Sequence, residues 1–398
     1  MNQKSKKRST SGTPGSPWYA VLYWLSRPYL FLKSPCRMET DGHFLPDGPA
    51  VYLSNHPSSF DYFHTAVKIW PRRAVPIANE FYMRKGLLKK LLTEIGVIPK
   101  KLFVDEASVI LKARRLIKSG HSVYLAPEGR LSVTGETYPI IPSTGAFVRF
   151  LSVPLVLIRF EEAYLGRPKW RPFTIRHRVT LRIRRILSPE ELKAMKPEEI
   201  NRLIKEALRA EETKAPPAEQ PLWRSRKKAL GLPNLIYRCP ACGELYSLKA
   251  AGNSLSCSAC DLKLMFNDHY QLEDNPHGLH TIADLYHALE EREKAEQPTL
   301  SSKVTVRRFR GEEEDAGEGE TLLSRDGFSF TGTVASEPLS FTVTPDALKA
   351  LPFSCGEEFE TYWQNELYYF YPTEYREQCA RWALWADLLC ETCYEEEK

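Results

Sequence analysis

Apolar residues recur between residues 50 and 212 with the two spacings that distinguish strands from helices. Short apolar runs predict strands at 50–55, 74–79, 122–129, 154–160 and 179–186, the third running into a loop. One-sided helical spacing predicts helices over 86–96, 105–120 and 188–212. The run at 154–160 is apolar almost throughout, as in a strand that is covered on both faces of its sheet. This alternation predicts an α/β domain, a sheet flanked by helices.

The stretch from Trp18 to Leu32 is apolar and aromatic, but Arg27 and Pro28 interrupt it. It falls short of the roughly 20 residues that a membrane-spanning helix needs. Its Trp, Tyr and Leu content favours a segment lying in a membrane interface, beside a basic tail over 1–16 that we predict to be disordered. The alternative is a helix packed on the domain's own core. The interfacial interpretation places a peripheral or monotopic protein on the cytoplasmic face of a membrane.

The composition changes after residue 213. Residues 213–223 are polar and rich in Pro, which is typical of a linker, and a helical pattern follows at 281–297. From residue 301 short β-like runs alternate with turns, and the chain ends in a helix-like run. This layout resembles that of pleckstrin-homology-like domains. The run GEEEDAGEGE at 311–320 predicts an acidic, solvated loop.

The formal net charge of +5 hides an asymmetry between the two parts of the chain. Residues 301–398 hold 9 Lys or Arg against 20 Asp or Glu, whereas the first 300 residues hold 46 against 30. A basic front half indicates an anionic partner, which could be a phosphate-bearing small molecule, a membrane surface or nucleic acid.

Four of the nine cysteines form two C-x-x-C pairs that are fourteen residues apart: Cys239, Cys242, Cys257 and Cys260. Four thiolates at this spacing predict a closed site for structural Zn²⁺ in a small zinc ribbon. The other five cysteines show no disulfide framework, which indicates a reducing compartment. Few aromatic residues are interleaved with Lys or Arg in the ribbon, so nucleic acid is not favoured as its partner.

A candidate catalytic pair lies where the strand at 50–55 ends. Pro57 biases His56 away from helical geometry and favours a helix starting at residue 57, which would place Asp61 one turn into that helix. From there the carboxylate can reach the imidazole, fix its tautomer and stabilise the imidazolium that forms when the other nitrogen takes a proton. Backbone amides at the start of the same helix are candidate donors to an oxyanion.

A second loop, PEGRLSVTG at 127–135, follows the strand at 122–125. Glu128, Gly129 and Arg130 lie at its start. Gly129 lets the backbone approach a ligand closely, and Arg130 offers a planar fork of donors that suits phosphate.

In this order, about 70 residues apart, the two motifs resemble the glycerolipid acyltransferase superfamily, which includes glycerol-3-phosphate and lysophosphatidate acyltransferases. The Gly-Ala pair at 145–146 and the strand VPLVLIRF at 153–160 extend the resemblance, which covers about residues 17–213. It implies that His56 is the general base, that Asp61 orients it, and that Glu128, Gly129 and Arg130 bind the acceptor.

The resemblance also implies the substrates. The acceptor would be a lysophospholipid or glycerol phosphate, and the co-substrate acyl-CoA or acyl-carrier protein. In the commonest family loop, E-G-T-R-S, the Arg stands one position later than Arg130 does. The loop here is more similar to that of the branch that acylates 2-acylglycerophosphoethanolamine, which argues against lysophosphatidate as the sole acceptor.

The predicted organisation has six regions. They are the basic tail (1–16), the acyltransferase domain with its membrane-contacting segment (17–213), a linker (214–233), the zinc ribbon (234–268), a helical connector (269–300) and an acidic β-rich domain closed by a helix (301–398).

Two other functions stay open at this point. One is a transferase domain that has lost its activity and tethers a zinc-ribbon interaction protein to membranes. The other is a thioesterase that uses the same histidine with water as the nucleophile.

Overall fold

The computed structural model describes residues 17–83, 86–103, 107–210, 221–311 and 313–396, so the basic tail predicted over 1–16 lies outside it. The chain divides into two compact units. The first comprises Met1–Gly129, Thr137–Glu161 and Arg178–Ala210, and the second comprises Arg130–Glu136, Glu162–His177 and Glu211–Lys398. Two loops that follow strands of the first unit thus pack with the C-terminal part of the chain.

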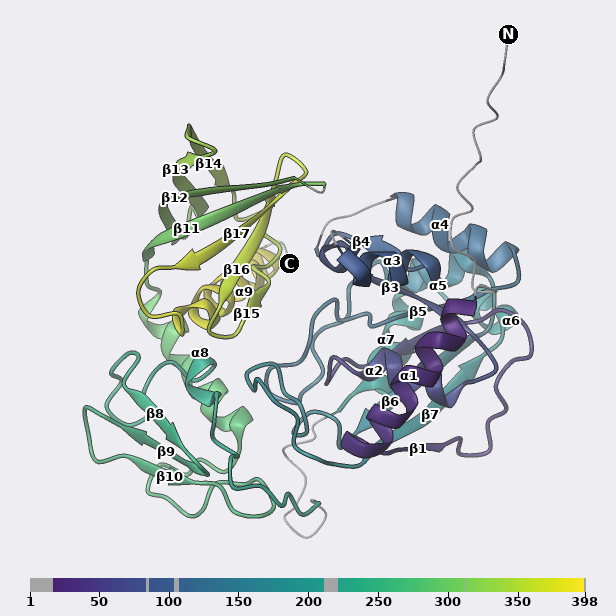
Figure 1. Cartoon of the computed structure of the whole chain (residues 1–398), viewed down its shortest axis with the longest axis horizontal. Coiled ribbons are helices and arrows are strands. Elements are labelled where there is room, and N and C mark those ends of the chain that lie inside the picture. The colour runs from purple at the N-terminus through teal and green to yellow at the C-terminus, as the bar shows by residue number, and fades with distance from the viewer. Residues whose placement is uncertain (1–16, 84–85, 104–106, 211–220, 312, 397–398) are drawn as a thin grey trace. The chain divides into compact units, whose positions relative to one another are not determined.

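A seven-stranded mixed sheet forms the centre of the first unit, in the order β1-β7-β6-β2-β5-β3-β4 (Figure 1). Only β6 and β7 run antiparallel, and the other neighbours are parallel. The five predicted strands are present. The strands are β1 (Cys36–Glu39), β2 (Val51–Ser54), β3 (Ala74–Asn79), β4 (Ile98–Lys100), β5 (Ser122–Leu125), β6 (Leu155–Glu161) and β7 (Val179–Leu187).

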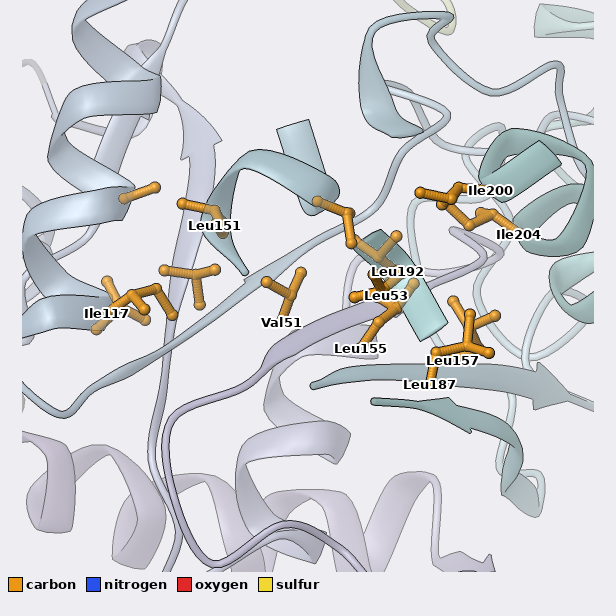
Figure 2. Close-up of a cluster of buried hydrophobic side chains, with 14 of the residues drawn as sticks. Val51, Leu53, Ile117, Leu151, Leu155, Leu157, Leu187, Leu192, Ile200 and Ile204 are labelled. Carbon is orange, nitrogen blue, oxygen red and sulfur yellow. The ribbon is translucent and has the colours of Figure 1, made fainter. Parts of the chain in front are cut away.

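Helices cover both faces of this sheet, as the sequence predicts. Val51 and Leu53 of β2 point into one apolar core, while Tyr52 between them is fully buried from the opposite face. Figure 2 shows the first core, in which Leu151 and Ile200 from two of the helices meet the strands. The helices of this face are α4 (Ala107–Lys118), α5 (Thr144–Leu151), α6 (Pro189–Ala194) and α7 (Pro197–Leu208). The other face is covered by α1 (Pro17–Lys33), α2 (Asp61–Lys68) and α3 (Gly86–Glu94), with a 3₁₀ turn η1 (Glu80–Met83).

Helix α1 has two different faces. A second apolar core lies between the sheet and the helices α1, α2 and α3, and Tyr19 and Leu22 are buried in it. Tyr23 stacks on Trp70 with ring centroids 4.5 Å apart. Its exposed apolar residues are Trp18, Val21, Trp24, Leu25, Tyr29, Phe31 and Leu32. No helix in the described ranges is long and apolar enough to cross a membrane. One face of α1 therefore packs on the core of the domain, and its other face is apolar and exposed.

Three sequence-based predictions of local structure were wrong. Helix α2 begins at Asp61 and not at Pro57, because residues 57–60 form a turn, so Asp61 is the first residue of the helix. The helix predicted over 188–212 is two helices, since Pro197 holds Lys196 in an extended conformation with ψ 154°. The acidic loop predicted at 311–320 is instead mostly part of a strand, Glu313–Ser324.

The N-terminal part of the second unit carries a small antiparallel sheet in the order β10-β9-β8. It is made of β8 (Leu248–Ala251), β9 (Ser254–Cys257) and β10 (Lys263–Met265), preceded by the 3₁₀ turn η3 (Leu232–Asn234). The predicted helix follows as α8 (Ile282–Glu296), which starts at a reciprocal capping box between Thr281 and Asp284.

The C-terminal part of the second unit is a seven-stranded antiparallel sheet in the order β14-β13-β12-β11-β17-β16-β15 (Figure 1). The first strand of this region thus pairs with its last, and a helix follows. The elements are β11 (Leu300–Arg310), β12 (Glu313–Ser324), β13 (Gly327–Val334), β14 (Glu337–Val343), β15 (Phe353–Ser354), β16 (Glu358–Trp363), β17 (Glu366–Pro372) and α9 (Gln378–Glu396). The acidic run is a strand because it lies opposite basic residues of β11, with Arg308 facing Asp315 and Arg310 facing Glu313.

A buried carboxylate joins three elements of the second unit. Glu293 of α8 is fully buried and accepts hydrogen bonds from Arg381 of α9 at 2.9 Å and from the Tyr237 hydroxyl at 3.2 Å. The Arg238 guanidinium, next to the first cysteine pair, lies 3.6 Å away. Two arginines thus compensate one desolvated charge.

Removing this carboxylate should destabilise the second unit. Glu293→Ala leaves the nearly buried Arg381 without its carboxylate, whereas Arg238 keeps Glu296 at 2.6 Å. Breaking a buried ion pair on one side typically costs about 3–5 kcal/mol. We expect a matching decrease in the free energy of unfolding in a urea titration followed by tryptophan fluorescence. Glu291→Ala, two residues earlier with a side chain that is 77% exposed, is the control and should change stability little. Equal effects of the two substitutions would contradict a central role for Glu293.

Candidate active site and metal centre

Parallel pairing brings the two sequence motifs to the same edge of the sheet. Strand β2 pairs in parallel with β5, Leu53 lying opposite Leu125. His56 follows the end of β2 and Glu128 follows the end of β5, so the two loops meet at the carboxyl ends of their strands. The Glu128 carboxylate accepts a hydrogen bond from the His56 backbone N–H at 2.8 Å.

Asn55 extends the sheet by one residue beyond β2. Its side-chain amide donates to the Phe160 carbonyl at 3.1 Å, and its side-chain oxygen accepts from the Phe160 N–H at 2.7 Å. The side chain therefore replaces a backbone partner of β6 and fixes the point at which His56 leaves the sheet. Asn55 was not among the residues predicted from the sequence, although an Asn directly before the His at a strand end is a recognisable signal.

The imidazole of His56 pairs with Asp61. His56 Nδ1 lies 2.9 Å from Asp61 Oδ2, and the Ser58 N–H donates to the same oxygen at 3.1 Å. Asp61 is fully buried, whereas the His56 side chain is 29% exposed. Burial raises the pKa of Asp61, and the hydrogen bond and charge of His56 oppose that shift. With Nδ1–H donating to this carboxylate, Nε2 is left as the nitrogen that can take a proton.

Glu128 is a buried bridge between two loops. Its second oxygen accepts from the Tyr138 N–H at 2.8 Å, so both oxygens are used by backbone amides. Burial raises the pKa of Glu128 to about 7, while the amide of Tyr138 and then the charge of His56 oppose the shift. The Glu128 carboxylate thus holds the His56 backbone in place, although burial makes its own negative charge unfavourable.

The rest of the second loop divides between the two units. Gly129 has φ 71°, and a Cβ there would lie 3.1 Å from the Ile141 side chain, so the turn requires glycine. Arg130 belongs to the second unit, where its guanidinium pairs with Asp387 of α9 at 2.6 Å. The structure therefore brings together His56, Asp61 and Glu128, and gives Arg130 a carboxylate partner of its own.

Backbone amides near the start of α2 were expected to be oxyanion donors, but three of them are engaged within the turn. The Ser58 N–H donates to Asp61, the Phe60 N–H donates to the Ser58 hydroxyl, and the Asp61 N–H donates to the Ser58 carbonyl. The first of these bonds holds the Asp61 carboxylate, the other two close the turn, and all three amides are engaged and not turned toward a developing charge.

The four predicted cysteines converge in the second unit. Their sulfur atoms all lie within 4.8 Å of one another, with Cys239 and Cys260 at 3.7 Å and Cys242 and Cys257 at 3.8 Å. A tetrahedron with metal–sulfur bonds of about 2.3 Å has edges of about 3.8 Å, so these separations fit a tetrahedral ion. The cluster could hold a metal.

Comparison with known proteins found a family match for residues 37–160. Residues 37–160 match the Acyltransferase family. The 1-acyl-sn-glycerol-3-phosphate acyltransferase alpha of Mus musculus is 30% identical over 174 residues, and that of Bos taurus is 31% identical over 175. Each match covers 41% of this chain and 58% of the relative, so the chain spans little more than half the length of these relatives.

A solved structure was also found: the 1-acyl-sn-glycerophosphate (LPA) acyltransferase PlsC from Thermotoga maritima. It is 18% identical, with a TM-score of 0.42, over 48% of this chain and 76% of that chain. The matched sequence range contains both motifs, from His56 to Arg130. Residues 37–160 therefore form an acyltransferase domain that is related to the 1-acyl-sn-glycerol-3-phosphate acyltransferases.

Proposed function

We propose that this protein transfers an acyl chain from acyl-CoA or acyl-carrier protein to a free hydroxyl of a lysophospholipid or glycerol phosphate. The observation that carries the proposal is the His56–Asp61 contact of 2.9 Å, at a sheet edge inside the range that matches the acyltransferase family. The buried carboxylate fixes the ring tautomer, and the half-buried ring remains open to a substrate.

In the proposed reaction His56 Nε2 takes the proton of the acceptor hydroxyl. The hydroxyl oxygen attacks the carbonyl carbon of the thioester, and an ester bond forms as the carbon–sulfur bond breaks. The leaving thiolate takes the proton back from the imidazolium, so His56 ends the cycle neutral. Asp61 stabilises the imidazolium between these steps.

Glu128 has the role of a positioning residue in this proposal, because both of its oxygens accept backbone hydrogen bonds. Gly129 and Arg130 follow it in the chain and are assigned to the acceptor, Arg130 to its phosphate. A charge-assisted guanidinium contact of this kind suits a phosphate group.

We also propose that α1 lies in a membrane interface. Its exposed side includes Trp24, Leu25, Phe31 and Leu32, while Arg27 and Lys33 supply positive charge on the same helix. Aromatic and basic residues together are typical of helices at the headgroup level of a bilayer. A lipid acceptor would reach the first unit from such a surface.

For the cysteine cluster we propose structural Zn²⁺, held by Cys239, Cys242, Cys257 and Cys260. Four thiolates without an open position are typical of structural sites. The ion would cross-link β9 and the loops beside it. The three short strands themselves bury only Leu248, Leu255 and Leu264.

The test of the proposed activity is a product assay on the purified chain with a panel of lysophospholipids and both donors. We expect His56→Ala and Asp61→Asn each to lower acyl transfer by roughly 10²–10⁴-fold, the usual contribution of a general base. His121→Ala, a surface histidine of the same unit, is the control. Near-wild-type turnover by His56→Ala would exclude the mechanism, and free fatty acid without esterified lipid would indicate a thioesterase.

Glu128 provides a prediction about pH. Its carboxyl pKa is about 7 in the folded chain against a usual 4.5, so between these values the folded state binds a proton that the unfolded state has lost. Wild-type stability should therefore fall as the pH rises through this window. At 1.36 kcal/mol per pKa unit, the loss is about 3 kcal/mol.

Glu128→Gln does not titrate, so its stability relative to wild type should increase by about that amount from pH 4.5 to 8. The absolute stability also carries a constant cost, since the two backbone N–H groups point at different oxygens and the NH₂ that replaces one of these oxygens cannot accept a hydrogen bond. Urea unfolding across this pH range measures the difference, with Glu206→Gln on the exposed side of α7 as control. A difference that does not change with pH would contradict the buried, titrating carboxylate.

The metal proposal predicts about one zinc ion per chain in elemental analysis. Chelation, or Cys242→Ser, should loosen the small sheet, because the metal would be its cross-link between the two C-x-x-C pairs. Hydrogen exchange over residues 234–268 reads this out directly. Cys36→Ser, in β1 of the other unit, should retain the full zinc content, and a metal-free wild-type protein would refute the site.

A further inference from the structure

The arginine of the second motif is held by a carboxylate far away in the sequence. Arg130 Nη1 donates to both oxygens of Asp387, at 2.7 and 2.6 Å. The two side chains are 24% and 17% exposed, so water screens this ion pair only partly. Both residues belong to the second unit.

The loop that follows Arg130 is fastened at its other end as well. Glu136 pairs with His287 of α8 at 2.8 Å, and the Tyr164 hydroxyl donates to the Val133 carbonyl in between. Residues 130–136 are thus tied to both long helices of the second unit. These contacts keep the backbone that follows Arg130 within the second unit, where Asp387 lies.

Lys169 of the second unit feels the charge of Arg130 and that of two glutamates. Desolvation lowers the pKa of Lys169, the nearby positive charge of Arg130 lowers it further, and Glu358 and Glu360 oppose these effects. Both glutamates are more than nine-tenths buried, and one oxygen of Glu358 has no hydrogen-bond partner among the described residues. A dianion entering beside Arg130 would be repelled by the Asp387 carboxylate, with only partial screening by water.

We propose that Asp387 is a specificity-determining residue, which competes with the phosphate of the acceptor for the guanidinium of Arg130. This rests on the proposed function, in which Arg130 serves the acceptor. A phosphomonoester such as lysophosphatidate must displace the Asp387 carboxylate before its phosphate can pair with the Arg130 guanidinium. An acceptor whose headgroup makes no such contact is unaffected by Asp387.

The experiment compares wild type, Asp387→Asn and Asp387→Ala with two acceptors, lysophosphatidate and a monoacylglycerol that has no phosphate. Loss of the competing charge should raise kcat/KM for lysophosphatidate about tenfold or more, the range of one charge-assisted hydrogen bond, and leave the monoacylglycerol unchanged. The increase should disappear in Arg130→Ala/Asp387→Asn, because the guanidinium is then missing. Asp326→Asn, an exposed carboxylate in the turn between β12 and β13, is the matched control.

Titration calorimetry with glycerol 3-phosphate, against glycerol, separates this inference from the proposed activity. Tighter binding of glycerol 3-phosphate by Asp387→Asn supports the inference even if the wild type acylates no acceptor, in which case only the proposed function fails. The inference would be overturned if both Asp387 variants bound glycerol 3-phosphate no more tightly than the wild type and lost kcat/KM equally for lysophosphatidate and the monoacylglycerol. Asp387 would then be an anchor of the loop.

Discussion

The hydrogen bonds from two backbone amides to the Glu128 carboxylate are the interaction on which the candidate site depends. One oxygen holds His56 and the other holds Tyr138, so a single side chain sets the spacing of two loops that leave neighbouring parallel strands. The burial that makes these bonds rigid also makes the negative charge costly, which is why its pKa is raised to about 7. Rigidity at His56 and a desolvated charge at Glu128 are two results of the same packing.

The central sheet and the His56–Asp61 contact could be predicted because their signals are local. Strands such as 154–160 are recognisable from their apolar runs, and His56 and Asp61 are five residues apart. The start of α2 was misplaced because Pro57 permits a helix but does not require one, while hydrogen bonds to Ser58 and Asp61 stabilise a turn. The strand at Glu313 was missed because its charges are compensated only by the opposing β11, which composition alone cannot show.

The contacts of the second unit could not be predicted for a different reason. Arg130 and Asp387 are 257 residues apart, and Glu293 lies 88 residues from Arg381, so no spacing in the sequence connects them. The four cysteines are the exception, because tetrahedral coordination by two C-x-x-C pairs imposes a recognisable pattern. Arg130 was therefore assigned from its motif alone, and its carboxylate partner became visible only in the folded chain.

Because one face of α1 is buried and the other is exposed, removing the helix to improve the solubility of the chain has a structural cost. The Tyr19 hydroxyl accepts a hydrogen bond from the Ala74 N–H at 3.2 Å, at the first residue of β3, and its ring stacks beside Trp70. A chain that begins after Lys33 would leave that amide and the second core uncovered, since the helix is both a surface element and part of the interior. Replacing the exposed Trp24, Leu25 and Phe31 by polar residues would reduce aggregation and leave the buried face of the helix unchanged.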